Sequence, residues 1–454
     1  MKPTKITFLL LLLCNFSIAQ KSYTLNGNFP QAPNKEIVLK AFTMLGDSLL
    51  SKTTADAVGK FSINYPARYR GASLLEIKDA KSVIVLLNKE NLEMNWDNFE
   101  DYKSLTYKSS PENTAFVNGI AVTQKVEQIV SALNFIKPIY EKELPSSPKK
   151  IKWVTEEIAN QNKAFSEYIN SLPENLYAKY YLKLRKLIEE MPTTATKYPE
   201  RILQHQKEFT AMNFASNDLV RSGLYRELLE GYFQLMESKG NLDSVNKDTN
   251  AGIDVLLKSL EKQPQLKQEV AEYLFRFFEE RSLFKASEHL ALAMLDSQSC
   301  EMGNKRMALF EQYRKMAIGK KADDIVFHNA TQPILTLNSI TSKYKLVVFG
   351  ATWCTKCQEE IPKLKLYYED WKTKYDMEIV FISLDSEKEK YNEFVKDFPW
   401  LSSSELKGWE AKASLDYCVF GTPTMYLLDA NNTILSKPIS EKQIQSWLEM
   451  NEKK

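Results

Sequence analysis

The sequence predicts a multidomain protein with an N-terminal all-β sandwich, an all-α middle region and a C-terminal α/β domain. Three observations predict it: short alternating apolar runs at the start, helical spacing with few glycines in the middle, and strands alternating with helices at the end. A chain of 454 residues is long enough for about three hydrophobic cores. The expected divisions are a signal peptide over 1–20, a β-sandwich over 21–100, a helical domain over 110–317 and an α/β domain over 318–454.

The β region is indicated by short runs between Ser22 and Asp97, separated by Gly, Pro, Asn and Asp. In one of these runs, Phe61, Ile63 and Tyr65 alternate with polar residues and should project to one face of a strand. No candidate site residue stands out in this region.

The helical region, from about Pro111 to Ala317, shows apolar residues at helical spacing. One helix is expected to begin at the capping residue Ser216 and to continue to a stop at Gly240. Prolines divide the region into eight or nine expected helices, and there is no clean internal repeat. The aromatic faces of these helices are expected to be core rather than ligand sites.

The α/β region begins at Gly319, and a central sheet with helices on both faces is expected. Asn431 and Asn432 suit a hairpin turn before the strand at Ile434. The expected strands and helices are 334–337, 345–350, a helix from the cysteines to 375, 378–384, 387–398, 425–428, 434–437 and 441–449.

Two cysteines, Cys354 and Cys357, follow the apolar strand Lys345–Gly350 at a spacing of one helical turn. A helix that begins near Cys354 would stabilise a thiolate there through its free N–H groups and macrodipole, and Lys356 adds a positive charge. The spacing also brings Cys357 within the Cα separation of about 5.5 Å that a disulfide tolerates. We therefore expect Cys354 to attack a substrate disulfide and Cys357 to resolve the mixed disulfide.

Other uses of a CxxC pair fit the sequence less well. Structural zinc usually takes four ligands, whereas Cys300 and Cys418 are isolated and the three histidines are scattered. A peroxide-reducing PxxxTxxC centre needs Thr three residues before its cysteine, and that place holds Ala351 before Cys354. No metal is expected.

The last 135 or so residues resemble exported TlpA-like thiol/disulfide oxidoreductases of the thioredoxin family. The matching residues are Phe349–Cys357, Glu360, Pro362, the run Tyr417–Thr424 and the strand Met425–Leu428. The resemblance implies a thioredoxin fold whose redox-active group is the Cys354–Cys357 disulfide, with no other cofactor. It also implies an enzyme that reduces protein disulfides and is recharged by a membrane electron donor.

The resemblance assigns roles around the dithiol. Pro423 matches the family's cis-proline and would lie against Cys354, and the Thr422–Pro423 turn would pair with an extended substrate segment. An ordinary loop proline is the alternative for Pro423. Trp353 is expected to shield the site and to line the substrate surface with Thr422 and Pro423.

Glu360 lies three residues after Cys357, on the same helical face, where it could relay a proton to or from the resolving thiol. A solvated carboxylate, like its neighbour Glu359, is the alternative. Pro362 should kink the helix because it removes a backbone donor.

The N-terminus is typical of a secretory signal peptide: Lys2 and Lys5 precede the apolar run Ile6–Cys14, and Ser17–Ala19 supplies small residues for cleavage. The run is shorter than the roughly 20 residues that span a bilayer. Leu13 argues against a lipoprotein, because such signals want a small residue before the cysteine. We expect a protein exported to the periplasm without a membrane segment in the mature chain.

Composition limits the partners. With 60 basic and 58 acidic side chains there is no net field to attract nucleic acid or an anionic membrane. Few cysteines in an exported chain of this length mean that stability does not rest on disulfides. Cys418, close in sequence to Pro423, is expected to be a buried structural thiol, although a third redox thiol or a pairing with Cys300 stays open.

Three functions remain open at this stage. The first is a protein-disulfide reductase, the second a disulfide oxidase or isomerase with the same residues, and the third a redox-sensitive adaptor that binds partners through its helical region. The combination of Cys354, Cys357, Glu360 and Pro423 favours turnover, because an adaptor needs none of them.

Overall fold

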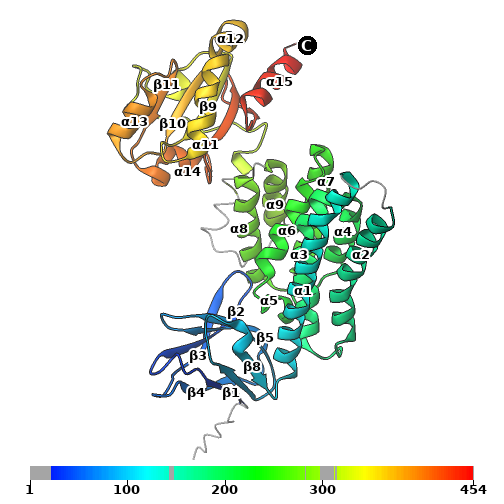
Figure 1. Ribbon diagram of the computed structural model, residues 1–454. Helices are drawn as coiled ribbons and strands as arrows, with labels where there is room; N and C mark the ends of the chain where they lie inside the picture. The colour runs from blue at the N-terminus through cyan, green and yellow to red at the C-terminus, as the bar shows by residue number, and fades with distance from the viewer. Residues whose placement is uncertain (1–21, 143–147, 282, 297–310, 312–313, 453–454) are drawn as a thin grey trace, which may run out of the picture. The chain divides into compact units, whose positions relative to one another are not determined.

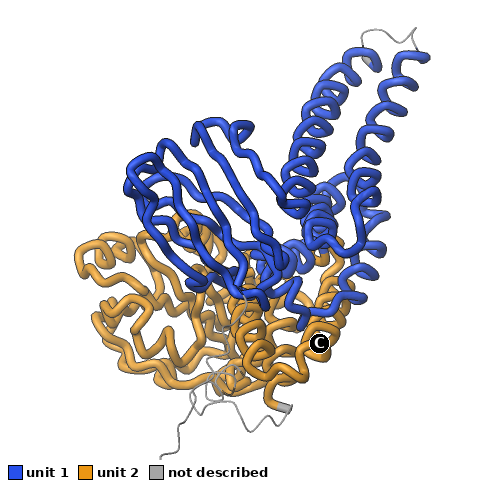
Figure 2. Tube along the Cα trace, turned by 90° about the horizontal axis from the view of Figure 1, so that it is seen from below, with its two compact units in different colours: residues 1–235 blue, residues 236–454 orange. Residues whose placement is uncertain are grey.

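The computed structural model describes residues 22–142, 148–281, 283–296, 311 and 314–452. The predicted signal peptide, Cys14 and Cys300 lie outside the described residues. The chain forms two compact units, 1–235 and 236–454, coloured separately in Figure 2.

The N-terminal part of the first unit consists of two four-stranded sheets, as the alternating pattern predicted (Figure 1). Phe61, Ile63 and Tyr65 all point into one core that both sheets share, which makes the pair a sandwich. One sheet has the order β4 (Lys60–Pro66), β1 (Ser22–Asn28), β7 (Leu92–Trp96), β8 (Leu105–Lys108). The other has the order β3 (Asp47–Thr54), β2 (Glu36–Phe42), β5 (Arg70–Ile77), β6 (Ser82–Asn88).

The middle region is helical, as predicted, and its described residues include the nine α-helices α1 to α9. Six contribute to the first unit: α1 (Pro111–Lys142), α2 (Pro148–Ser171), α3 (Tyr177–Lys197), α4 (Ile202–Thr210), α5 (Asn217–Val220) and α6 (Tyr225–Glu237). The second unit holds α7 (Leu242–Ser259), α8 (Pro264–Glu280) and α9 (Phe284–Asp296). None of the helices in the described ranges is both long and apolar enough to cross a membrane.

The single helix predicted from Ser216 to Gly240 is wrong, because the chain breaks between α5 and α6. Ser216 does cap α5 by accepting a hydrogen bond from the Leu219 N–H, and Gly240 follows the end of α6 as expected. At the break Gly223 has φ 74°, and a Cβ there would lie 2.8 Å from the Phe42 ring. The apolar spacing continues across the break, so it could not reveal this left-handed turn.

The C-terminal α/β domain is built on a five-stranded sheet with the order β11 (Leu401–Ser404), β10 (Met377–Ser383), β9 (Tyr344–Gly350), β12 (Thr424–Asp429), β13 (Ile434–Ser436). β9, β10 and β11 are parallel, whereas β12 runs antiparallel to β9. The helices are α11 (Thr355–Glu360), α12 (Lys365–Tyr375), α13 (Lys388–Val395), α14 (Lys412–Asp416) and α15 (Glu441–Asn451).

The two faces of this sheet are covered differently. Alternate residues such as Leu346, Val348 and Phe381 share a core with α12, α13 and α15. On the other face, the rings of Phe349 and Tyr426 contact Tyr417, which directly follows α14, at centroid distances of 5.3 and 5.4 Å. The predicted sheet between helical layers is confirmed.

Two details of this domain differ from the expectation. The strand predicted at 334–337 is wrong: Thr336 makes a single bridge to Val326, and a 3-10 turn begins at Leu337. β11 was not predicted, because three of its four residues are serines. These serines are buried, and the hydroxyl of Ser403 donates to the His328 carbonyl at 2.9 Å, which offsets the cost of burying it.

Glu90, which precedes β7, is expected to make the stability of the first unit depend on pH. Burial raises the pKa of Glu90 to about 7 from 4.5, although the Ser110 hydroxyl donates to its carboxylate. Since the folded protein holds this proton more tightly, the unfolding free energy that Glu90 contributes is fully present below pH 4.5 and is lost as the pH rises through 7. Glu90→Gln should remove this loss, about 1 kcal/mol after allowance for solvent screening.

The measurement is the urea midpoint at acid and mildly alkaline pH. The exposed neighbour Glu93 provides the control, as Glu93→Gln should leave the pH dependence intact. An equal change in both variants would contradict the assignment to Glu90.

Candidate active site

The site begins at the end of β9, where every residue is buried. A Cβ on Gly350 would lie 2.5 Å from Ile361 Cδ1 and 3.4 Å from Cys357 Sγ. Glycine therefore allows the following helix to pack closely onto the strand end, which brings Cys357 to the edge of the sheet.

The two cysteines are both free thiols, and they occupy different environments. Cys354 is half-buried and caps α11, with its Sγ accepting a hydrogen bond from the Cys357 N–H at 3.1 Å. Cys357 is 0% exposed, and its pKa is raised to about 12 by burial and by the hydrogen bond with Cys354. A substrate sulfur can thus approach Cys354, whereas Cys357 is reached from within the protein.

The turn before β12 lies beside Cys354, as predicted. The Thr422–Pro423 peptide bond is cis, and Cys354 Sγ donates to the Thr422 carbonyl at 3.2 Å. The sheet order explains the proximity: β12 pairs with β9, with Thr424 opposite Phe349. Thr422 and Pro423 are half-buried, and their contact with a substrate stays a prediction.

Trp353 is 55% exposed. Its ring therefore offers an aromatic surface next to Cys354 and shields the site less than expected. Its ring lies 5.7 Å from that of Trp409, which is 42% exposed. Trp409 was missed, because it follows the turn residue Gly408 in a stretch without strand or helix periodicity.

The helix is interrupted at Pro362, as expected. α11 ends at Glu360, a 3-10 turn covers Pro362–Leu364, and α12 continues from Lys365. Glu360 is half-buried, and its carboxylate accepts from Lys363 Nζ at 2.7 Å. The proton relay from Glu360 to Cys357 stays a prediction.

Glu360→Gln should keep the fold and slow thiol/disulfide exchange about tenfold or more near neutral pH, because it removes a base for a buried thiol of raised pKa. The measurement is the pH profile of the exchange rate. The exposed neighbour offers the control, and Glu359→Gln should retain the wild-type profile. If Glu360→Gln does so too, Glu360 is a solvated carboxylate.

Asp385 was missed by the sequence reasoning, although it is 2% exposed and contacts the segment before the cysteines. Its carboxylate accepts from the Thr352 N–H and from Thr352 Oγ1, the latter at 2.6 Å. One signal could have found it: Asp385 follows a predicted strand as Thr352 follows another, and the carboxyl ends of parallel strands meet at one edge.

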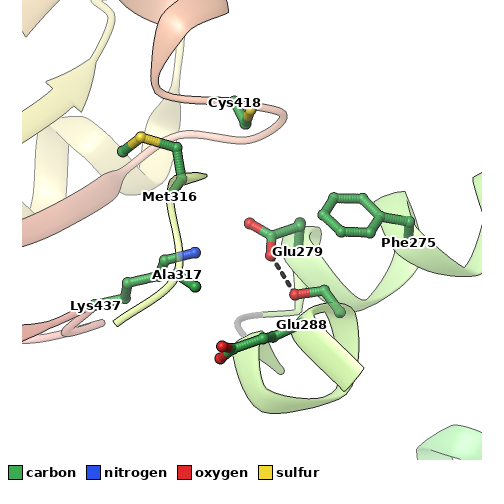
Figure 3. Close-up of a pocket in the computed structure, with 8 residues that line it drawn as sticks. Phe275, Glu279, Glu288, Met316, Ala317, Cys418 and Lys437 are labelled. Carbon is green, nitrogen blue, oxygen red and sulfur yellow. Dashed lines mark hydrogen bonds between the residues drawn. The ribbon is translucent and has the colours of Figure 1, made fainter. Parts of the chain in front are cut away.

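Cys418 is buried, as predicted, and it is a free thiol in this structure. It lines a small cavity of the second unit with Glu279 and Lys437 (Figure 3). Burial, with a further contribution from Glu279, raises the pKa of Cys418 to about 12. These surroundings are those of an unreactive thiol.

The described part of the chain contains no group of three or more His, Cys, Asp or Glu side chains that could hold a metal ion. His205 contacts Thr194 at 2.9 Å, His289 contacts Asp254 at 2.7 Å, and His328 lies beside β11.

The similarity of this chain to a known protein family lies in the C-terminal α/β domain, which contains Cys354 and Cys357. A family model described as thioredoxin-like matches residues 342–434. The thiol-disulfide oxidoreductase ResA of Bacillus cereus is 28% identical over 144 residues, 31% of this chain and 82% of that protein. The thiol:disulfide interchange protein CycY of Rhizobium leguminosarum is 31% identical over 121 residues, 27% of this chain and 63% of that protein.

Solved structures are also similar. A thioredoxin-like protein from Bacteroides caccae aligns with 54% of this chain and 93% of its own, with 18% identity and a TM-score of 0.41. The thioredoxin domain of a thiol-disulfide oxidoreductase from Bacteroides vulgatus aligns with 30% and 97%, with 25% identity and a TM-score of 0.28. The C-terminal α/β domain is therefore a thioredoxin-like domain, and its sequence relatives include proteins named thiol-disulfide oxidoreductases.

Proposed function

We propose that this protein is an exported thiol:disulfide oxidoreductase that reduces protein disulfides through Cys354 and Cys357. The observation that carries the proposal is the asymmetry of the pair: Cys354 is accessible at the start of α11, Cys357 is buried, and the Thr422 carbonyl lies 3.2 Å from Cys354 Sγ. A nucleophile that substrates can reach and a resolving thiol that they cannot reach are what two-step disulfide reduction requires.

In the first step the Cys354 thiolate attacks one sulfur of the substrate disulfide. The substrate S–S bond breaks, a Cys354–substrate bond forms, and the other substrate sulfur leaves as a thiolate that takes up a proton. The cis turn at Thr422–Pro423 offers backbone groups to an extended substrate segment beside that bond.

In the second step Cys357 loses its proton and attacks Cys354 Sγ. The mixed disulfide breaks, the second substrate sulfur is released and protonated, and two electrons have passed from the dithiol to the substrate. Because burial raises the pKa of Cys357, this step needs a base, and Glu360 is the candidate. The resulting Cys354–Cys357 disulfide would be reduced again by a membrane electron donor.

Export is proposed from the N-terminal sequence alone, in which Lys2 and Lys5 precede the apolar run Ile6–Cys14. Mass spectrometry of the protein isolated from its native cells should show that the first 20 or so residues have been removed. An intact Met1 on a protein found inside the cell would contradict export.

The reduction potential of the full-length protein tests the direction. Equilibration in glutathione or dithiothreitol buffers should give a value closer to the roughly −270 mV of thioredoxin than to the roughly −120 mV of a strong oxidant. A reduction potential near that of the strong oxidant would favour a disulfide oxidase. Such an enzyme uses the same residues, with electrons moving in the opposite direction. Failure of the two thiols to form an internal disulfide would refute both enzymes and leave the adaptor.

A further inference from the structure

Asp385 lies where two parallel strands end side by side. β9 and β10 are in register, with Gly350 opposite Ser383, and the Leu384 N–H donates to the Gly350 carbonyl at 2.8 Å. The chain therefore leaves both strands at the same edge, so that Asp385 lies next to the segment that leads to Cys354.

The carboxylate of Asp385 is satisfied by neutral donors. Oδ1 accepts from the Thr352 N–H at 3.1 Å and from Thr352 Oγ1 at 2.6 Å. Oδ2 accepts from the same N–H at 3.2 Å and from Ser383 Oγ at 2.7 Å. Hydrogen bonds to a carboxylate are stronger than those between neutral groups, and burial strengthens them further.

Every polar group of Thr352 forms a hydrogen bond. Its N–H and hydroxyl bind Asp385, and its carbonyl accepts from Gln358 Nε2 at 2.5 Å. Gln358 belongs to α11, so Thr352 links the end of β10 to the helix that Cys354 caps. Only Trp353 separates Thr352 from Cys354.

We propose that Asp385 is a positioning residue that sets the reactivity of Cys354 through Thr352. By holding Thr352, it keeps Cys354 Sγ within 3.1 Å of the Cys357 N–H and 3.2 Å of the Thr422 carbonyl. Asp385 does not touch the reacting sulfur. The inference rests on the proposed function only in that Cys354 is taken as the attacking thiol.

The test compares variants along this link in the full-length protein. Asp385→Asn places an amide donor against the donors of Thr352, and Thr352→Val removes the hydroxyl while keeping the backbone N–H. We expect the alkylation of Cys354 by iodoacetamide to slow about tenfold in Asp385→Asn. A tenfold change is about the effect of losing one hydrogen bond to a charged group. Thr352→Val should slow it less, and Thr352→Ser should restore the wild-type rate.

A merely structural role is distinguished by two further readouts. The pH profile of Cys354 alkylation and the reduction potential should both move in Asp385→Asn, whereas loss of stability alone moves neither. Asp376→Asn is the matched control, because Asp376 lies at the opposite end of β10, where it accepts from the Lys343 N–H at 3.0 Å. It should leave the profile and the potential unchanged.

Each outcome of this test either supports or overturns the role proposed for Asp385. An unchanged alkylation rate and pH profile in folded Asp385→Asn would overturn the proposal. If that variant does not fold, Thr352→Val decides by the same readouts. Alkylation needs no protein substrate, so a wild-type protein without reductase activity would refute the proposed function and leave this inference to be judged separately.

Discussion

Replacing Cys357 with serine is expected to leave the protein covalently attached to its substrates, and replacing Cys354 with serine is expected to trap none. The accessible Cys354 can still attack in the first variant, but the buried residue that would break the mixed disulfide has lost its thiol. Both variants should lose turnover by roughly three orders of magnitude or more, as other enzymes do when a nucleophile is removed. Non-reducing electrophoresis followed by mass spectrometry of the trapped species provides the measurement.

Cys418→Ser supplies the matched control for this pair. Cys418 is the third free thiol of the described residues and is buried, with its pKa raised to about 12, so its loss should leave both turnover and trapping intact. Trapping by Cys354→Ser as readily as by Cys357→Ser would reverse or remove the assigned roles. No trapping by either, in lysates that contain oxidised proteins, would count against disulfide exchange altogether.

Much of this arrangement could be predicted because it depends on local patterns. Cys354 and Cys357 are brought together by helix geometry, and the alternation of Phe61, Ile63 and Tyr65 determined which face of a strand is buried. The cis turn at Pro423 was expected from a family resemblance, and the structure has it beside Cys354.

The features that escaped prediction depend on contacts between distant parts of the chain. Asp385 and Thr352 are 33 residues apart, and only the parallel pairing of β9 with β10 joins them. Three consecutive serines are typical of a loop, and the sequence does not show that Ser403 forms hydrogen bonds with the backbone of His328. At Gly223, the left-handed turn interrupts a helical pattern that continues on both sides.

Helices α8 and α9 both contact the thioredoxin-like domain, and α8 does so near its cis turn, which bears on what the accessory regions do. The ring of Phe275 in α8 lies 6.1 Å from that of Phe420, and Lys437 Nζ lies 4.9 Å from the ring of Phe284 in α9. Phe420 is three residues before Pro423. Helix α8 therefore lies close to the turn that is proposed to bind substrate, whereas α9 contacts the residue that follows β13.

A fragment that begins at Gly319 is expected to fold and to reduce a generic disulfide such as that of insulin. It retains every proposed reactive residue and the whole sheet, and the segment at its start still pairs with β13, since the Gly319 N–H donates to the Ile434 carbonyl at 2.7 Å. Without α8 and α9, however, Phe420 loses its contact with Phe275. The fragment carrying Cys357→Ser should then capture a broader set of partners than the full-length Cys357→Ser protein.

A longer fragment separates the contributions of the two units, because one that begins at Met236 keeps α7, α8 and α9. If the helices beside the cis turn restrict access, this fragment should capture the narrow, full-length set. If the first unit recruits the partners, the fragment should capture the broad set, because it lacks the β-sandwich, α1–α5 and all but the last two residues of α6. Identical sets from all three proteins would remove the recognition role of the accessory regions. A folded but inactive fragment from Gly319 would show instead that a residue needed for the chemistry lies upstream.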